Sequence, residues 1–142
     1  MNIRLGFAFV VTLTLATITA AQSQTAPQVP AAFETVGKVI GKAGTLNADG
    51  SYRINFPRTD VKFKNSKGMI IPADLGLATY IAFSSAGEKS LAVGDFAMLD
   101  SEIDRVIDAL RAGKFEVVSM HNHMTAENPR LFYVHFQKSG TV

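Results

Sequence analysis

The pattern of apolar and polar positions predicts one helix and then short strands in the first half of the chain. Apolar residues recur at helical spacing over 33–40. Apolar and polar residues alternate over 52–56, which predicts a half-buried strand. A polar turn separates two apolar stretches over 61–71, so we expect a β-hairpin there.

The second half of the chain contains two longer apolar runs, at 79–85 and 90–99. A short segment rich in turn-forming residues lies between them, which predicts a second, more buried hairpin. Gly94 interrupts the second run, and we expect it to mark a β-bulge.

The most complete helix signal follows Asp100 or Ser101, either of which is a suitable N-cap. The apolar residues of 103–110 fall on one helical face, acidic residues occupy the first turn, and Gly113 lies past the last turn. All local signals therefore agree on a helix of about ten residues.

Two more strands are predicted, at 115–123 and 130–137. The second half of the chain then has the order β-α-β-β. Because hairpins dominate and only one or two helices are available, we expect a single α+β domain with a mainly antiparallel sheet.

The N-terminus has the pattern of a secretory signal peptide over residues 1–21, in which a basic start precedes an uncharged apolar run and small residues. The apolar run is shorter than the roughly 20 residues that a membrane-spanning helix needs. We expect cleavage after Ala21, a polar linker at 22–32 and the domain at 33–142. The product would be periplasmic or secreted, with no stable membrane anchor after signal cleavage.

Composition narrows the function further. The chain has 14 basic and 12 acidic residues and a net charge of +2, too little for a nucleic-acid-binding surface, so we expect no nucleic-acid partner. With 47% hydrophobic and 18% charged residues, it resembles ordinary globular proteins. There is no cysteine, which excludes disulfides and a lipidated cysteine and leaves burial or a bound ion to stabilise the domain.

All three histidines of the chain, His121, His123 and His135, fall within 15 residues. His121 and His123 share one face of a strand because they are two residues apart. A hairpin centred on Asn128 would place His135 directly opposite His121, and the three imidazoles would then converge. Glu127, in the connecting loop, would be a fourth ligand or a general base for a metal-bound water.

Three imidazoles and one carboxylate suit a divalent transition metal. Zinc is the leading candidate, and copper, nickel, iron and manganese remain open because no thiolate selects among them. Two other interpretations remain: a metal-free ligand or catalytic pocket, and histidines that only pack and hydrogen-bond within a half-buried sheet.

Two further polar sites are ambiguous in the sequence. Arg58 and Asp60 follow the strand at 52–56 and suit either a structural turn or an anion site. Asp95 lies in an otherwise apolar strand, where an unpaired carboxylate is costly to bury. We expect Asp95 at a solvated rim, beside a cation or near the histidines.

Several segments of the chain together resemble the LppY/LpqO family of bacterial exported proteins and lipoproteins, built around a domain of unknown function. They are Pro57–Asp60, Val93–Leu99 with Glu102, His121–His123 and Glu127–Arg130 through His135. The resemblance runs from about Phe33 to Gly140. The residues that match the family's pattern are His121, His123, Glu127, Pro129, Arg130 and His135.

The resemblance implies no established activity. The lipoprotein members carry a cysteine for lipid attachment, which this chain lacks. Longer members carry two copies of the domain, so a homodimer could restore the paired arrangement here.

From the sequence we therefore predict a small exported domain that binds a divalent transition metal, or another small ligand, through His121, His123 and His135, with Glu127 as fourth ligand or support. One alternative is a metal-dependent hydrolase of the cell envelope in which Glu127 is the general base. Another is a metal-free module that recognises the cell wall or a partner protein.

Overall fold

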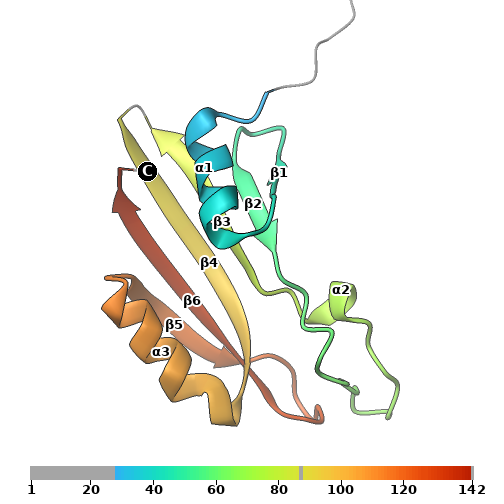
Figure 1. The fold of residues 1–142 in the computed structure, drawn as a ribbon. Helices are drawn as coiled ribbons and strands as arrows, with labels where there is room; N and C mark the ends of the chain where they lie inside the picture. Colours follow the sequence, from blue (N-terminus) through green and yellow to red (C-terminus); the bar gives the residue numbers. More distant parts are fainter. Residues whose placement is uncertain (1–27, 87, 142) are drawn as a thin grey trace, which may run out of the picture.

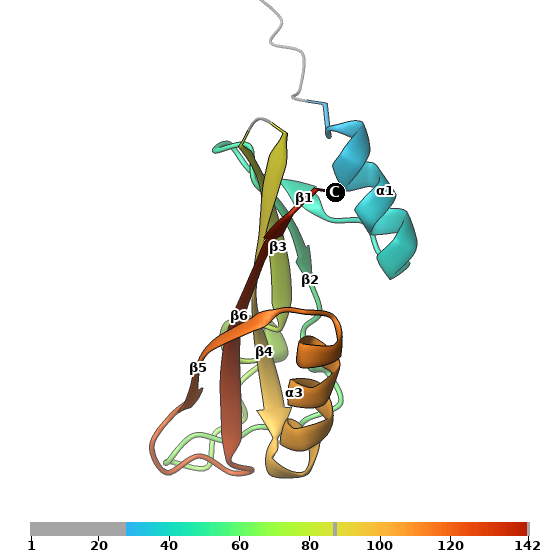
Figure 2. The same ribbon diagram turned by 90° about the vertical axis from the view of Figure 1, so that its left-hand side faces the viewer.

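The structure is a computed structural model that describes residues 28–86 and 88–141. The expected signal peptide lies outside the described residues. Six antiparallel strands form one sheet in the order β1-β2-β3-β4-β6-β5 (Figure 1). Helices α1 and α3 lie on the same side of this sheet (Figure 2). The predicted α+β class with a mainly antiparallel sheet is confirmed.

The strands are β1 (Thr45–Leu46), β2 (Tyr52–Asn55), β3 (Tyr80–Ala86), β4 (Lys89–Leu99), β5 (Glu116–Asn122) and β6 (Leu131–Gly140). The helices are α1 (Ala31–Ile40), the short α2 (Ala73–Gly76), the 3₁₀ turn η1 (Asp100–Glu102) and α3 (Ile103–Ala112). Both predicted longer helices are present, and the second predicted hairpin is the pair β3–β4. Among the described residues, none of the helices has the length and apolar character needed to cross a membrane.

The hydrophobic core lies between the sheet and the two longer helices. We call the side of the sheet that packs against α1 and α3 the helix face, and the opposite side the open face. Phe33 of α1 and Leu110 of α3 join the buried residues Ile54, Val134 and Phe136 of the sheet in one cluster. Because strand side chains alternate between the two faces, the intervening residues belong to the open face.

Gly94 does not mark a bulge, contrary to the prediction. Strand β4 pairs with β6 without interruption, and Gly94 is the direct partner of Phe136. A Cβ at this position would collide with the Phe136 ring. The glycine is therefore needed because the aromatic ring lies across the backbone, not because the strand bends there.

The predicted hairpin at 61–71 is confirmed as an antiparallel reversal of the chain, but its arms are too weakly paired to form strands. A single bridge joins Lys64 to Ile70. Met69 and Ile70 are about 60% exposed, so the second arm buries too little apolar surface to support a strand pair. Lys64 also exchanges two backbone hydrogen bonds with Asn128.

Arg58 belongs to a structural network. Its guanidinium binds the carboxylates of Asp60 and Glu102 and donates to the Ala97 carbonyl oxygen. Glu102 also accepts a hydrogen bond from the backbone N–H of Leu99, just before α3. These bonds fix the segment after β2 to the start of α3, which resolves Arg58 and Asp60 as structural.

The strands that carry the histidines pair in a different register from the predicted one. His135 is the partner of Ser119, and His121 is the partner of Tyr133. This register centres the hairpin on Glu127 rather than on Asn128. The pairing is shifted by two residues, which preserves the face, and His121 and His135 therefore still lie on the same side of the sheet.

Candidate metal centre

Three side chains from three adjacent strands meet on the open face. Asp95 of β4 is the direct partner of His135 of β6, and His121 comes from the edge strand β5. One potential ligand atom from each of the three lies within 4.8 Å of the other two. This is the one group among the described residues that has the composition and spacing to hold a metal ion.

The two histidines turn the same ring nitrogen toward each other. His121 Nε2 and His135 Nε2 are 3.0 Å apart. Two nitrogens bound to one tetrahedral zinc at the usual bond length would be about 3.3 Å apart. The observed spacing therefore needs little adjustment to accept a metal ion.

The other ring nitrogen of each histidine faces an oxygen. His121 Nδ1 lies 2.9 Å from the Asn122 carbonyl oxygen, and His135 Nδ1 lies 3.5 Å from Asp95 Oδ1. A neutral imidazole that carries its proton on Nδ1 presents a lone pair at Nε2. At 3.0 Å the two Nε2 atoms either share one proton in a hydrogen bond or, if both rings carry their proton on Nδ1, present two lone pairs to a cation, as metal-binding histidines do.

Asp95 is only 9% exposed, and its Oδ1 has no hydrogen-bond partner among the described residues. Burial raises the pKa of the Asp95 carboxyl, and the neighbouring His135 and His121 act in the opposite direction. A buried carboxylate with an unsatisfied oxygen is costly without a cation. A metal ion at this position would supply that positive charge.

His123 and Glu127 form a separate pair. His123 Nδ1 is 2.9 Å from Glu127 Oε2, and Glu127 Oε1 accepts a hydrogen bond of 2.8 Å from the Leu131 N–H. The Glu127 side chain is 1% exposed. Both of its oxygens are already engaged, so Glu127 orients His123 and lies outside the cluster of potential ligands.

Tyr133 connects the two histidine groups. Its ring stacks on His123 at 4.9 Å and on His121 at 5.8 Å between ring centres. Burial, with Asp95 and Glu127 nearby, raises the pKa of Tyr133 to about 12, so its hydroxyl stays protonated at neutral pH. Tyr133 therefore provides a neutral aromatic platform that fixes both imidazoles.

The cluster opens into a cleft of about 380 Å³. Its walls include His123 and Tyr133, and two residues of α2, Asp74 and Leu75. Two histidines and one carboxylate form the ligand set of metal sites that keep open coordination positions for water or substrate. Any such position would face this cleft.

Of the four ligands predicted from the sequence, the structure brings together His121 and His135 and sets His123 and Glu127 apart as a pair. Asp95 takes the carboxylate position in the cluster. Sequence reasoning placed Asp95 near the histidines as one of three options, because an acidic residue in an apolar strand requires compensation. Its pairing with His135 depends on β4 lying next to β6, which the order of elements along the chain does not specify.

A protein-family profile described as Domain of Unknown Function (DUF1259) matches residues 34–142. The chain belongs to this uncharacterised domain family. The match covers the described domain except residues 28–33. It supports membership of an uncharacterised family, but it does not support the LppY/LpqO name. No match was found among curated proteins or among solved structures.

Proposed function

We propose that this chain is a small exported domain that binds one divalent transition metal through Asp95, His121 and His135. Zinc is the leading candidate, because imidazole and carboxylate donors suit it. Export rests on the signal-peptide pattern of residues 1–21, and it implies a periplasmic or secreted location.

One observation carries the proposal: His121 Nε2 and His135 Nε2 are 3.0 Å apart while their Nδ1 atoms face oxygens. With both ring protons on Nδ1, two lone pairs would converge beside the buried carboxylate of Asp95. A divalent cation at that point would relieve the repulsion between the nitrogens and neutralise the carboxylate in one step.

A metal-dependent hydrolase is the second candidate, and the number of protein donors favours it. Three donors leave at least one coordination position for a water whose pKa the metal would lower. The predicted general base, Glu127, has both oxygens engaged. His123, which Glu127 orients and which lines the cleft, is therefore the group placed to contact a bound substrate.

The direct test is elemental analysis of untagged protein, expressed from the full-length gene and recovered after export. We expect close to one zinc per chain, and an intact mass that shows cleavage after Ala21. The His121→Ala/His135→Ala variant should contain none, whereas the matched variant His123→Ala should keep its metal. Metal-free wild-type protein that resists reloading would overturn the proposal and leave a metal-free binding module.

A further inference from the structure

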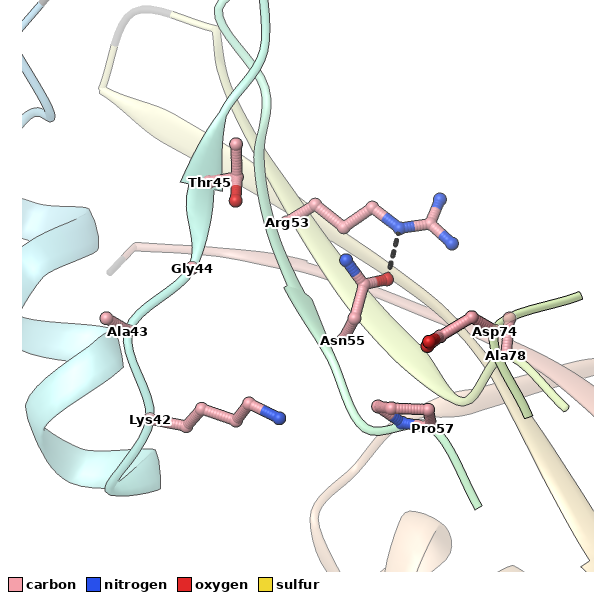
Figure 3. A pocket seen from close by; sticks show the side chains of 9 residues that line it. All are labelled: Lys42, Ala43, Gly44, Thr45, Arg53, Asn55, Pro57, Asp74 and Ala78. Carbon is pink, nitrogen blue, oxygen red and sulfur yellow. Dashed lines mark hydrogen bonds between the residues drawn. The ribbon is translucent and has the colours of Figure 1, made fainter. Parts of the chain in front are cut away.

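A second, larger pocket adjoins the metal cleft on the open face. Its volume is about 540 Å³, and Lys42, Arg53 and Asn55 lie on its walls (Figure 3). Asp74 and Ala78 line this pocket and the metal cleft alike. The two hollows therefore share a wall, and one elongated ligand can occupy both.

Arg53 is held in place on this surface. Its guanidinium carbon lies 3.4 Å from the centre of the Tyr80 ring, and its Nε donates a 2.7 Å hydrogen bond to Asn55 Oδ1. Tyr80 is the direct cross-strand partner of Asp95. Arg53 therefore stacks on the residue that lies directly beside Asp95 in the neighbouring strand.

The charge of Arg53 is not neutralised by an ion pair. Among the described residues, neither Arg53 nor Lys42 has a carboxylate within 4.0 Å. Arg58 provides the contrast, because Asp60 and Glu102 occupy its guanidinium. The Asp74 carboxylate also faces the pocket and offsets one of the two cations, which leaves a net positive wall (Figure 3).

Within the described part of the chain, the terminal amino groups of Arg53 have no hydrogen-bond partner, and the contacts of the side chain hold them in place. A guanidinium presents two parallel N–H donors that match a carboxylate or a phosphate. Because stacking on Tyr80 and the bond to Asn55 already order the side chain, little conformational entropy remains to be lost when an anion binds.

We infer that this pocket binds the anionic end, a carboxylate or a phosphate, of the ligand that the metal centre takes. The link to the metal rests on the proposed function. The anion site does not, because neither Lys42 nor Arg53 belongs to the group of potential metal ligands.

The first test uses full-length exported protein stripped of metal with a chelator. Inorganic phosphate and acetate are titrated separately, and binding is followed by NMR chemical shifts of the backbone amides. The expected shifts cluster around Lys42, Gly44 and Arg53. The stronger of the two probes identifies the anion as phosphate or carboxylate.

The variant Arg53→Gln should weaken that binding about tenfold, as expected for loss of a charge-assisted bidentate contact. Arg105→Gln, on α3 at the helix face, is the matched loss of charge and should leave binding unchanged. If Arg53→Gln fails to fold, Arg53→Lys keeps the charge without the planar fork and should bind more weakly than wild type. Equal binding by wild type and Arg53 variants, or shifts confined to other surfaces, would overturn the inference.

The second test compares acetate with succinate, a dicarboxylate, on zinc-loaded protein. If one ligand spans both hollows, zinc should strengthen succinate binding more than acetate binding, and Arg53→Gln should remove that difference. Protein that binds phosphate but no metal would contradict the proposed function alone. Protein that binds metal but gives no Arg53-dependent response to either anion would contradict this inference alone.

Discussion

The two faces of the sheet differ in how their side chains are packed and paired, and two neighbouring residues of β4 show this difference. Gly94 points to the helix face and has no side chain, because Phe136 fills the space above it. Asp95 points to the open face, and its buried Oδ1 accepts no hydrogen bond from the residues that the structure describes. The helix face is closed by apolar packing, whereas the open face retains polar groups whose interactions are incomplete.

Within one sheet, the helix face therefore contributes to folding stability and the open face carries the groups that can bind a ligand. Aromatic rings at Phe96 and Phe115 pack edge-on against Phe136 and complete the helix face. On the open face, Asp95 and Arg53 both retain capacity to bind a ligand. Substitutions on the helix face should therefore change folding without changing ligand binding, and substitutions on the open face should do the reverse.

The largest expected effect is on the open face. His121→Ala/His135→Ala should remove zinc binding completely, because both imidazole donors are lost. Its melting temperature without metal should stay close to that of wild type, since His121 is exposed and His135 half-exposed. Zinc titration and thermal melts of the same samples check this prediction. A variant that also unfolds would contradict the claim that open-face substitutions change ligand binding without changing folding.

The helix face should give the next effect. Gly94→Ala forces a methyl group into the Phe136 ring and should cost about 1–3 kcal/mol in the free energy of unfolding, as overpacked cores do. Zinc stoichiometry in the folded protein should remain one per chain. Denaturant unfolding followed by metal analysis measures both quantities, and unchanged stability would show that the ring moves freely.

Asp95→Asn should change zinc affinity and folding stability in opposite directions. Removal of the carboxylate should lower zinc affinity at least about tenfold. Burial raises the pKa of Asp95 above its ordinary value of 3.8, so ionisation opposes folding as the pH rises above that value. Metal-free Asp95→Asn should therefore melt at a higher temperature than wild type at pH 7, and a lower one would contradict the account of a strained, unsatisfied carboxylate.

The smallest effect concerns acid stability. Arg58 lowers the pKa of Glu102 below its ordinary value of 4.5. This pair therefore contributes stability above that value and loses it as the pH falls through the lowered pKa. Glu102→Gln should flatten the decrease in unfolding free energy below about pH 4.5, with no change in zinc content at pH 7. A profile parallel to wild type would show that other carboxyls dominate acid unfolding.

The elements of this fold could be predicted because their signals are local. The apolar face of 103–110 and the alternation over 52–56 are each read within one segment. The hairpin at 61–71 pairs through a single bridge, because alternation of apolar and polar residues does not show whether the second arm buries enough surface to form a strand. The collision that requires glycine at 94 involves Phe136, more than 40 residues away, and no local pattern reports it.

The site was predicted in part for the same reason. The spacing of His121 and His123 suggested a shared ligand set, but the side chains whose potential ligand atoms gather within 4.8 Å are His121, His135 and Asp95, without His123. Asp95 enters instead because β4 lies next to β6. A two-residue register error left His135 on the correct face, because strand side chains repeat every two residues.

The central claim is that two imidazoles and a carboxylate, rather than three imidazoles, bind the metal. X-ray absorption at the zinc edge, on reconstituted wild-type protein, counts bound imidazoles directly. The account predicts two imidazole ligands with oxygen donors completing the shell, and the same spectrum for His123→Ala. Three imidazoles in wild type, falling to two in His123→Ala, would contradict it and restore the ligand set expected from the sequence.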